Sequence, residues 1–164
     1  MTADPTYLET LLLYYEEEVE GEAYFNELAT RFEAPDAREK LLLLAEVERH
    51  AAHGVAPLLE QYDLIPRPRE ELSKMGRKDA QTTTVDWAEL LAGMNKTYPG
   101  YLVSFHKLEA MAPAADLPRL SFLTEHEVAA LKFLEIEAQD PAASAAPLRA
   151  YLDTDPVAWI ARAG

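Results

Sequence analysis

Residues 41–62 read LLLLAEVERHAAHGVAPLLEQY, and this stretch decides the fold of the chain. Its apolar residues recur at spacings of three and four, a pattern typical of a helix with one buried face. That face consists of Leu41, Leu44, Val47, Ala51, Val55, Leu58 and Tyr62. His50 follows Val47 by three residues, so its ring reaches the edge of the buried face. Polar groups at that edge are typical of a site between the helices of a bundle.

Three further stretches have the same periodicity. Residues 6–32 form the first predicted helix, and both stripes that fit it place Glu22 on the buried side. Residues 87–112 carry a long apolar stripe without an acidic residue. Residues 117–139 form the fourth helix, in which His126 lies on the same side as Leu123 and Ala130.

The connection from Asp63 to about Thr84 is long for a hairpin between neighbouring helices. In a four-helix bundle, one such connection means that the second and third helices run in the same direction. The sequence therefore predicts an all-α four-helix bundle over residues 1–140, with a long crossover between helices two and three. Residues 141–164 are predicted to be a tail of short helices that packs on the bundle or on a partner chain.

Composition excludes several classes of function. The formal charge is −14, from 15 basic and 29 acidic residues, which argues against nucleic acids and anionic membranes as partners. The chain has no cysteine, so thiolate nucleophiles, disulfides and iron–sulfur clusters are excluded. No apolar run is long enough to span a bilayer, and we expect a cytoplasmic protein. Six glycines, scattered singly, form no phosphate-binding loop, so no organic cofactor is predicted.

The order of the helices and two short segments resemble the ferritin-like superfamily. Residues 20–24, EGEAY, and residues 44–50, LAEVERH, are similar to the first two helices of rubrerythrin-like proteins and aldehyde-deformylating oxygenases. The resemblance covers about residues 6–139, and only the first helix pair is similar residue by residue. It implies a ferritin-like bundle with a metal site between the helices.

The di-iron site of that family uses one Glu on helix one, Glu-x-x-His on helix two, one Glu on helix three and Glu-x-x-His on helix four. Carried over, the family pattern places Glu22, His50 and His126 at three of these positions. The other acidic positions hold Val47, Met94 and Leu123. This depleted, degenerate di-iron motif leaves a 2-His-1-carboxylate set, which suits one divalent metal such as iron, manganese or zinc.

Several other side chains are secondary candidates for the metal. Glu18, Glu46 or Glu127 would add an oxygen ligand if a helix is rotated by one position. Glu46 or Glu48 would otherwise orient His50 without touching the metal. His53, beside the helix-disturbing Pro57, is a weaker ligand candidate.

Two hypotheses about function remain open at this point. The first is a metal-binding protein with oxidoreductase-type chemistry, whose catalytic residues the sequence does not identify. The second is a metal-free bundle that acts in binding or assembly. Its former metal cavity, lined by Val47, Met94, Leu123 and tyrosines, would be packed or hold a small apolar ligand. Under both we expect a homo-oligomer, most simply a dimer.

Overall fold

The computed structural model describes residues 3–163, and its regular secondary structure in that range is entirely helical. The all-α prediction is therefore confirmed. Three of the four long helices begin and end within two residues of the predicted bounds, and the second begins six residues before the stretch 41–62. The four are α1 (Pro5–Arg31), α2 (Pro35–Gln61), α4 (Trp87–Met111) and α5 (Leu117–Glu137).

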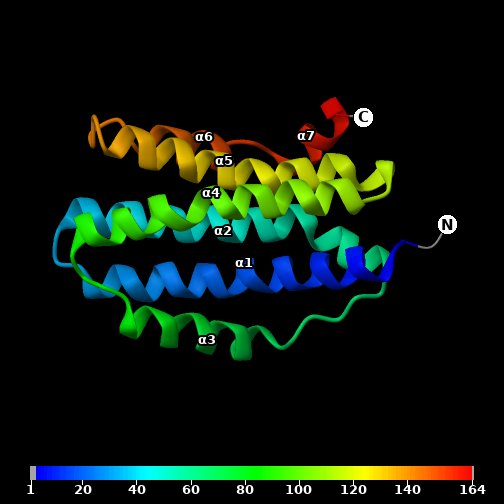
Figure 1. Ribbon diagram of the computed structural model, residues 1–164, viewed down its shortest axis with the longest axis horizontal. Coiled ribbons are helices and arrows are strands. Elements are labelled where there is room, and N and C mark those ends of the chain that lie inside the picture. Colours follow the sequence, from blue (N-terminus) through cyan, green and yellow to red (C-terminus); the bar gives the residue numbers. More distant parts are fainter. Residues whose placement is uncertain (1–2, 164) are drawn as a thin grey trace.

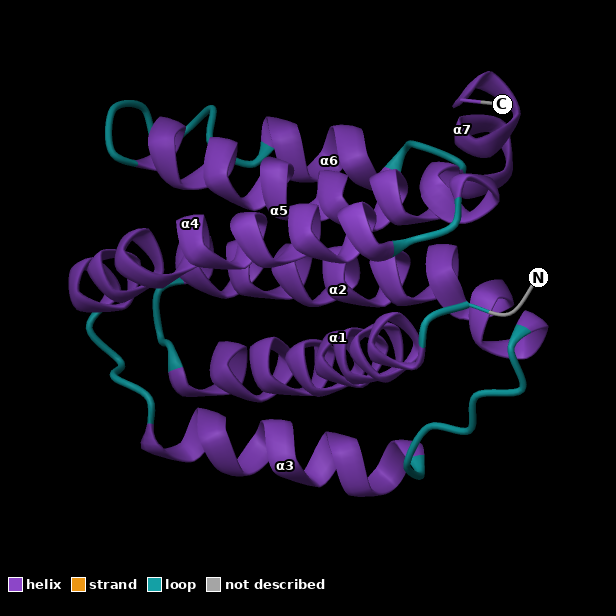
Figure 2. Cartoon of the chain, turned by 45° about the vertical axis from the view of Figure 1, so that its right-hand side comes forward, coloured by secondary structure: helices purple, strands orange, loops and turns teal. Residues whose placement is uncertain are grey.

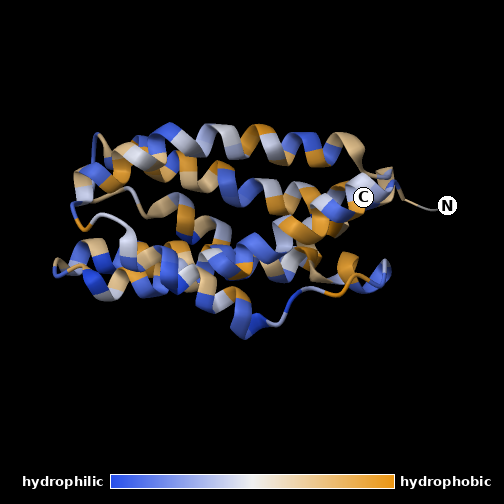
Figure 3. Ribbon diagram, turned by 60° about the horizontal axis from the view of Figure 1, so that its bottom comes forward, coloured by the Kyte–Doolittle hydropathy of each residue, from blue (hydrophilic) through white to orange (hydrophobic). Residues whose placement is uncertain are grey.

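The four long helices form two antiparallel pairs, α1 with α2 and α4 with α5, that pack through α2 and α5 (Figure 1). As the long connection predicted, α2 and α4 run in the same direction (Figure 1). Apolar and polar residues alternate along the long helices (Figure 3), so each can bury one side and expose the other. At the α2–α5 contact, Gly54 faces the ring of Phe122 so closely that a Cβ atom would collide with it.

The crossover contains a helix that the sequence analysis missed, α3 (Arg69–Thr82). It lies along the outer side of α1 (Figures 1 and 2). The two backbones approach closely because Gly76 has no side chain, and a Cβ atom there would collide with the Glu20 carbonyl oxygen. The guanidinium of Arg69 reaches the Glu22 carboxylate at 2.8 Å. Since α3 covers α1 only from outside, the face of α1 toward α4 stays open.

The C-terminal segment packs against the bundle. A 3-10 turn, η1 (Ala114–Asp116), leads into α5, and two short helices follow it, α6 (Ala146–Leu152) and α7 (Pro156–Ala163). Helix α6 contacts α5 and α2, and α7 contacts α5. The Tyr151 hydroxyl of α6 donates to the Phe122 carbonyl at 3.0 Å. Within residues 3–163, no helix is long and apolar enough to cross a membrane.

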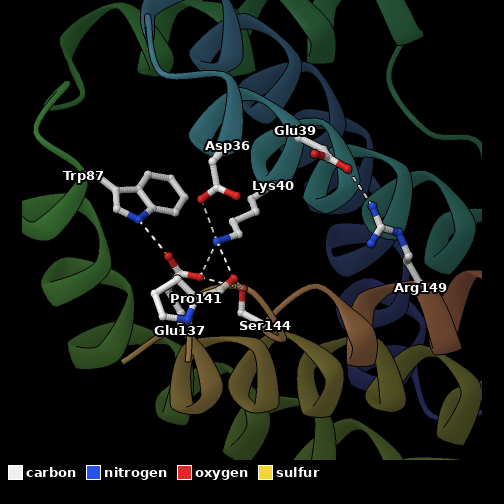
Figure 4. Close-up of polar contacts among 8 residues, drawn as sticks. All are labelled: Asp36, Glu39, Lys40, Trp87, Glu137, Pro141, Ser144 and Arg149. Carbon is white, nitrogen blue, oxygen red and sulfur yellow. Dashed lines mark hydrogen bonds and ion pairs between the residues drawn. The ribbon is translucent and has the colours of Figure 1, made fainter. Parts of the chain in front are cut away.

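A buried ion-pair network joins this segment to the bundle (Figure 4). Lys40 of α2 is 3% exposed and reaches Glu137 of α5 at 2.7 Å. Its ammonium also donates to Asp36 Oδ2 at 2.7 Å and to the Pro141 carbonyl at 2.9 Å. Glu137 in turn accepts hydrogen bonds from the Trp87 indole and the Ser144 hydroxyl. The two buried charges of this network, Lys40 and Glu137, are matched one to one, since Asp36 is exposed to solvent, and their hydrogen bonds are made.

Candidate metal centre

Three helices bring Glu18, Glu48 and His126 together in the middle of the bundle. One ligand atom of each lies within 4.8 Å of the other two. His126 Nε2 is 3.1 Å from Glu18 Oε2 and 3.4 Å from Glu48 Oε2. The side chains of His126 and Glu18 are only 3% and 6% exposed. This Glu18–Glu48–His126 cluster therefore lies where a charge needs a nearby counter-charge.

Helical spacing explains why these three residues face inward. Glu18 lies seven residues after buried Leu11 and seven before buried Phe25, which places all three on one side of α1. Glu48 follows buried Leu44 by four residues on α2. His126 lies between Leu123 and Ala130 on α5, as the sequence predicted.

The ring of His126 is held in an orientation that suits a ligand. Its Nδ1 contacts the carbonyl of Leu123, which can only accept, so Nδ1 carries the hydrogen. The other nitrogen, Nε2, then points at the two carboxylates. Phe105 packs against the imidazole with ring centroids 5.2 Å apart. A backbone contact at one nitrogen that fixes the other toward a cation is the usual arrangement of a metal-binding histidine.

The cluster has more negative than positive groups. Glu127 Oε2 lies 3.9 Å from His126 Nε2 as a third carboxylate. Glu18 Oε2 and Glu127 Oε1 are buried and make no hydrogen bond. Within residues 3–163, no lysine or arginine pairs with Glu18, Glu48 or Glu127. A cation that the chain itself does not supply would satisfy these oxygens.

The protonation behaviour of the cluster reflects this imbalance. Burial raises the pKa of Glu48 well above its ordinary value, and the adjacent Glu18 raises it further. Burial alone would lower the pKa of His126, but Glu18 and Glu48 outweigh burial, and the pKa is raised. Burial raises the pKa of Glu127 to about 7. Without a metal, protons must therefore hold the cluster together.

The cluster forms the inner end of a pocket of about 420 Å³. All four long helices contribute to its walls. Helix α1 adds Tyr14, Glu17 and Glu20, and α4 adds Tyr98 and Tyr101. Because Tyr101 is 50% exposed, the pocket connects the cluster with solvent. It is referred to below as the acidic pocket.

The structure places two of the three main candidates outside the cluster. Glu22 pairs with Arg69 of α3. His50 pairs with no carboxylate of residues 3–163, and its Nε2 donates to the Thr154 carbonyl at 2.7 Å. Only His126 of that trio is in the cluster. His50 follows Glu48 by two residues, a rotation of about 200° around the helix, so the two cannot face one site.

The secondary candidates divide in the same way. Glu18 and Glu48 are two of the three residues of the cluster, and Glu127 lies at its edge. Glu46 and His53 are exposed on α2. The positions carried over as lost ligands are packed, since Val47 and Leu123 are buried in the core. The seven-residue spacing of Leu11, Glu18 and Phe25 is the feature of the sequence that marks Glu18 as inward-facing.

Comparisons with protein-family models, with curated proteins and with solved structures found no match to this chain. The assignment of a function therefore rests on the geometry of the cluster and of its pocket.

Proposed function

We propose that the chain is a ferritin-like protein that binds one divalent metal ion through Glu18, Glu48 and His126. The observation that carries this proposal is three ligand atoms within 4.8 Å of one another, two of them carboxylate oxygens without a lysine or arginine partner among the described residues. Two carboxylates match the charge of a divalent ion, and a mixed oxygen and nitrogen set suits iron, manganese or zinc.

The residues around the cluster support a role in chemistry as well as in binding. A bound redox-active metal with open positions would supply oxidoreductase-type chemistry with dioxygen or peroxide. Glu127 lies beside His126 with a pKa of about 7, so its carboxyl can hold or release a proton at the pocket. Phe105 and the buried side of α5 keep water from the inner side of His126. Oxidoreductase activity is proposed on these grounds.

Metal content of the untagged full-length chain tests the proposal. We expect about one metal ion per chain by elemental analysis after reconstitution, and loss of it in Glu18→Gln, because this change removes one of two anionic ligands. Glu22→Gln is the matched control, since Glu22 lies on the same helix and pairs with Arg69 instead. The proposal is contradicted if Glu18→Gln and Glu22→Gln bind the same amount of metal. It is also contradicted if the parent chain binds no metal.

One observation favours a second candidate, the metal-free bundle. The pKa values of His126 and Glu48 are both raised, so both groups tend to stay protonated. A protonated imidazole, together with a proton shared between Glu48 and Glu18, would hold the cluster together without a metal. Function would then lie in ligand binding in the acidic pocket. An unchanged melting temperature on addition of iron, manganese or zinc favours this candidate, because a metal that binds only the folded chain must raise it.

A further inference from the structure

The acidic pocket continues into a second hollow along the groove between α1 and α4. This apolar hollow has a volume of about 440 Å³ and shares Glu48, Tyr98 and Tyr101 with the acidic pocket. The groove exists because α4 has few contacts with α1. From Leu90 to Phe105 on α4, its wall spans roughly 22 Å at 1.5 Å per residue.

The two hollows differ in chemistry. The acidic pocket is lined by five carboxylates, Glu17, Glu18, Glu20, Glu48 and Glu127. The walls of the apolar hollow are mainly aliphatic, aromatic and threonine side chains, with Tyr24 and Phe25 on α1 facing Leu90 and Met94 on α4. A ligand that fills both must therefore have one apolar part and one polar end.

The charge of the acidic pocket selects the polar end. Glu20 has Arg67 at 3.6 Å, but Glu17 has no ion-pair partner within residues 3–163. A divalent metal on the inner cluster would offset two of the five carboxylates and leave the pocket negative. Such a pocket repels carboxylates and phosphates and attracts ammonium groups. The exposed ring of Tyr101 adds a surface that favours cations.

We propose that the α1–α4 groove binds an amphiphilic organic amine. Its ammonium group pairs with Glu17 in the acidic pocket, and its alkyl chain lies in the apolar hollow between Tyr24 and Met94. This proposal names the class of ligand that the pocket binds. It rests on the proposed function in one respect: the metal ion is taken to occupy Glu18 and Glu48, which leaves Glu17 for the ammonium group.

Three probes with one chain length test the selection by charge. Decylamine, decanol and decanoate are titrated into the zinc-loaded full-length protein by calorimetry, below the concentrations at which they form micelles. A charge-assisted contact is expected to make decylamine bind at least about tenfold more tightly than decanol. Decanoate should not bind. Butylamine, with the same ammonium and a short chain, should bind more weakly than decylamine.

Two glycine variants test the placement of the alkyl chain. Gly93 lines the apolar hollow, and a Cβ atom there meets nothing within 4 Å, so the position accepts a larger side chain and we expect Gly93→Leu to occupy part of the hollow. We expect decylamine affinity to fall about tenfold, equivalent to roughly two buried methylene groups. Gly100→Leu is the matched control, because Gly100 is equally open on the same helix and lines neither hollow.

Glu17→Gln tests the placement of the ammonium group, and we expect it to abolish the preference for decylamine over decanol. The proposal is overturned if decanoate binds as well as decylamine, if Gly93→Leu and Gly100→Leu behave alike, or if decylamine releases the metal. Metal content, measured on the same samples, separates the two proposals. If the protein keeps its metal but does not bind decylamine, only the amine proposal is overturned. If a chain that binds no metal still binds decylamine, only the metal proposal is overturned.

Discussion

Two buried charge clusters of this bundle are built in opposite ways. Around Lys40, one buried ammonium group meets one buried carboxylate, Glu137, while Asp36 is exposed to solvent, and the remaining polar atoms are hydrogen-bonded (Figure 4). Around His126, two neighbouring carboxylates converge on one imidazole, and Glu18 Oε2 has no hydrogen bond. The chain thus completes one buried ionic network with its own side chains and leaves the other short of positive charge. That difference is the reason for proposing the Glu18–Glu48–His126 cluster as a metal site.

The largest expected effect comes from breaking the complete network. Lys40→Met leaves Glu137 buried without its counter-charge, and we expect a loss of about 3 kcal/mol in the free energy of unfolding. Urea denaturation measures this loss. Lys74→Met is the control, because Lys74 is exposed on α3 and its replacement should change stability by less than about 0.5 kcal/mol. A similar small effect at both positions would mean that the two clusters do not differ as described.

In the Glu18–Glu48–His126 cluster, removal of a charged group is expected not to lower the free energy of unfolding. Glu18→Gln removes one of two carboxylates that compete for His126, so in the metal-free protein we expect no loss of stability, or a gain of about 1 kcal/mol. Chemical denaturation in the presence of a chelator measures it. A strong loss of stability would show that the Glu18 carboxylate stabilises His126 in the same way as the Glu137 carboxylate stabilises Lys40.

The incomplete cluster should also make the stability of the chain depend on pH. The folded-state pKa of Glu127 is raised from 4.5 to about 7, so between these values the folded chain holds more protons than the unfolded chain. The contribution of Glu127 to stability is therefore complete below about pH 4.5 and decreases as the pH rises to 7. Denaturation of Glu127→Gln and of the parent across pH 5 to 8 should show a flatter profile for the variant. Identical profiles would exclude a perturbed Glu127.

The sequence predicted the parts of the fold that depend on periodic burial. The helices α1, α2, α4 and α5 each carry a regular apolar stripe, and their bounds were found within two residues except for the start of α2. Helix α3 was missed because only Leu72, Gly76 and Ala80 of its residues are buried, and it is held on α1 largely by Gly76 and by charged pairs. These buried positions recur every four residues, but two of the three are glycine and alanine, so they form no recognisable apolar stripe.

For the site, the sequence identified His126 and the inward-facing side of α1, but not the rotation of each helix. Glu18 and Glu22 lie on the same predicted stripe, and only the position of Arg69 on α3 shows that Glu22 is drawn outward. The family pattern points to His50 on α2, but the turn after α6 holds His50 through the Thr154 carbonyl, and Glu48 faces the cluster instead. Which of two neighbouring polar residues faces a site depends on tertiary contacts that no local pattern contains.

The loose attachment of α4 has a consequence for amide hydrogen exchange. Only four residues of α4 are buried, against twelve in α2, although the two helices are similar in length. Helices with few buried contacts open locally at a lower free energy, so the amides of α4 should exchange before those of α2. The three residues of the cluster, Glu18, Glu48 and His126, lie on α1, α2 and α5, and none lies on α4. Local opening of α4 would therefore widen the groove without moving the helices that carry the cluster.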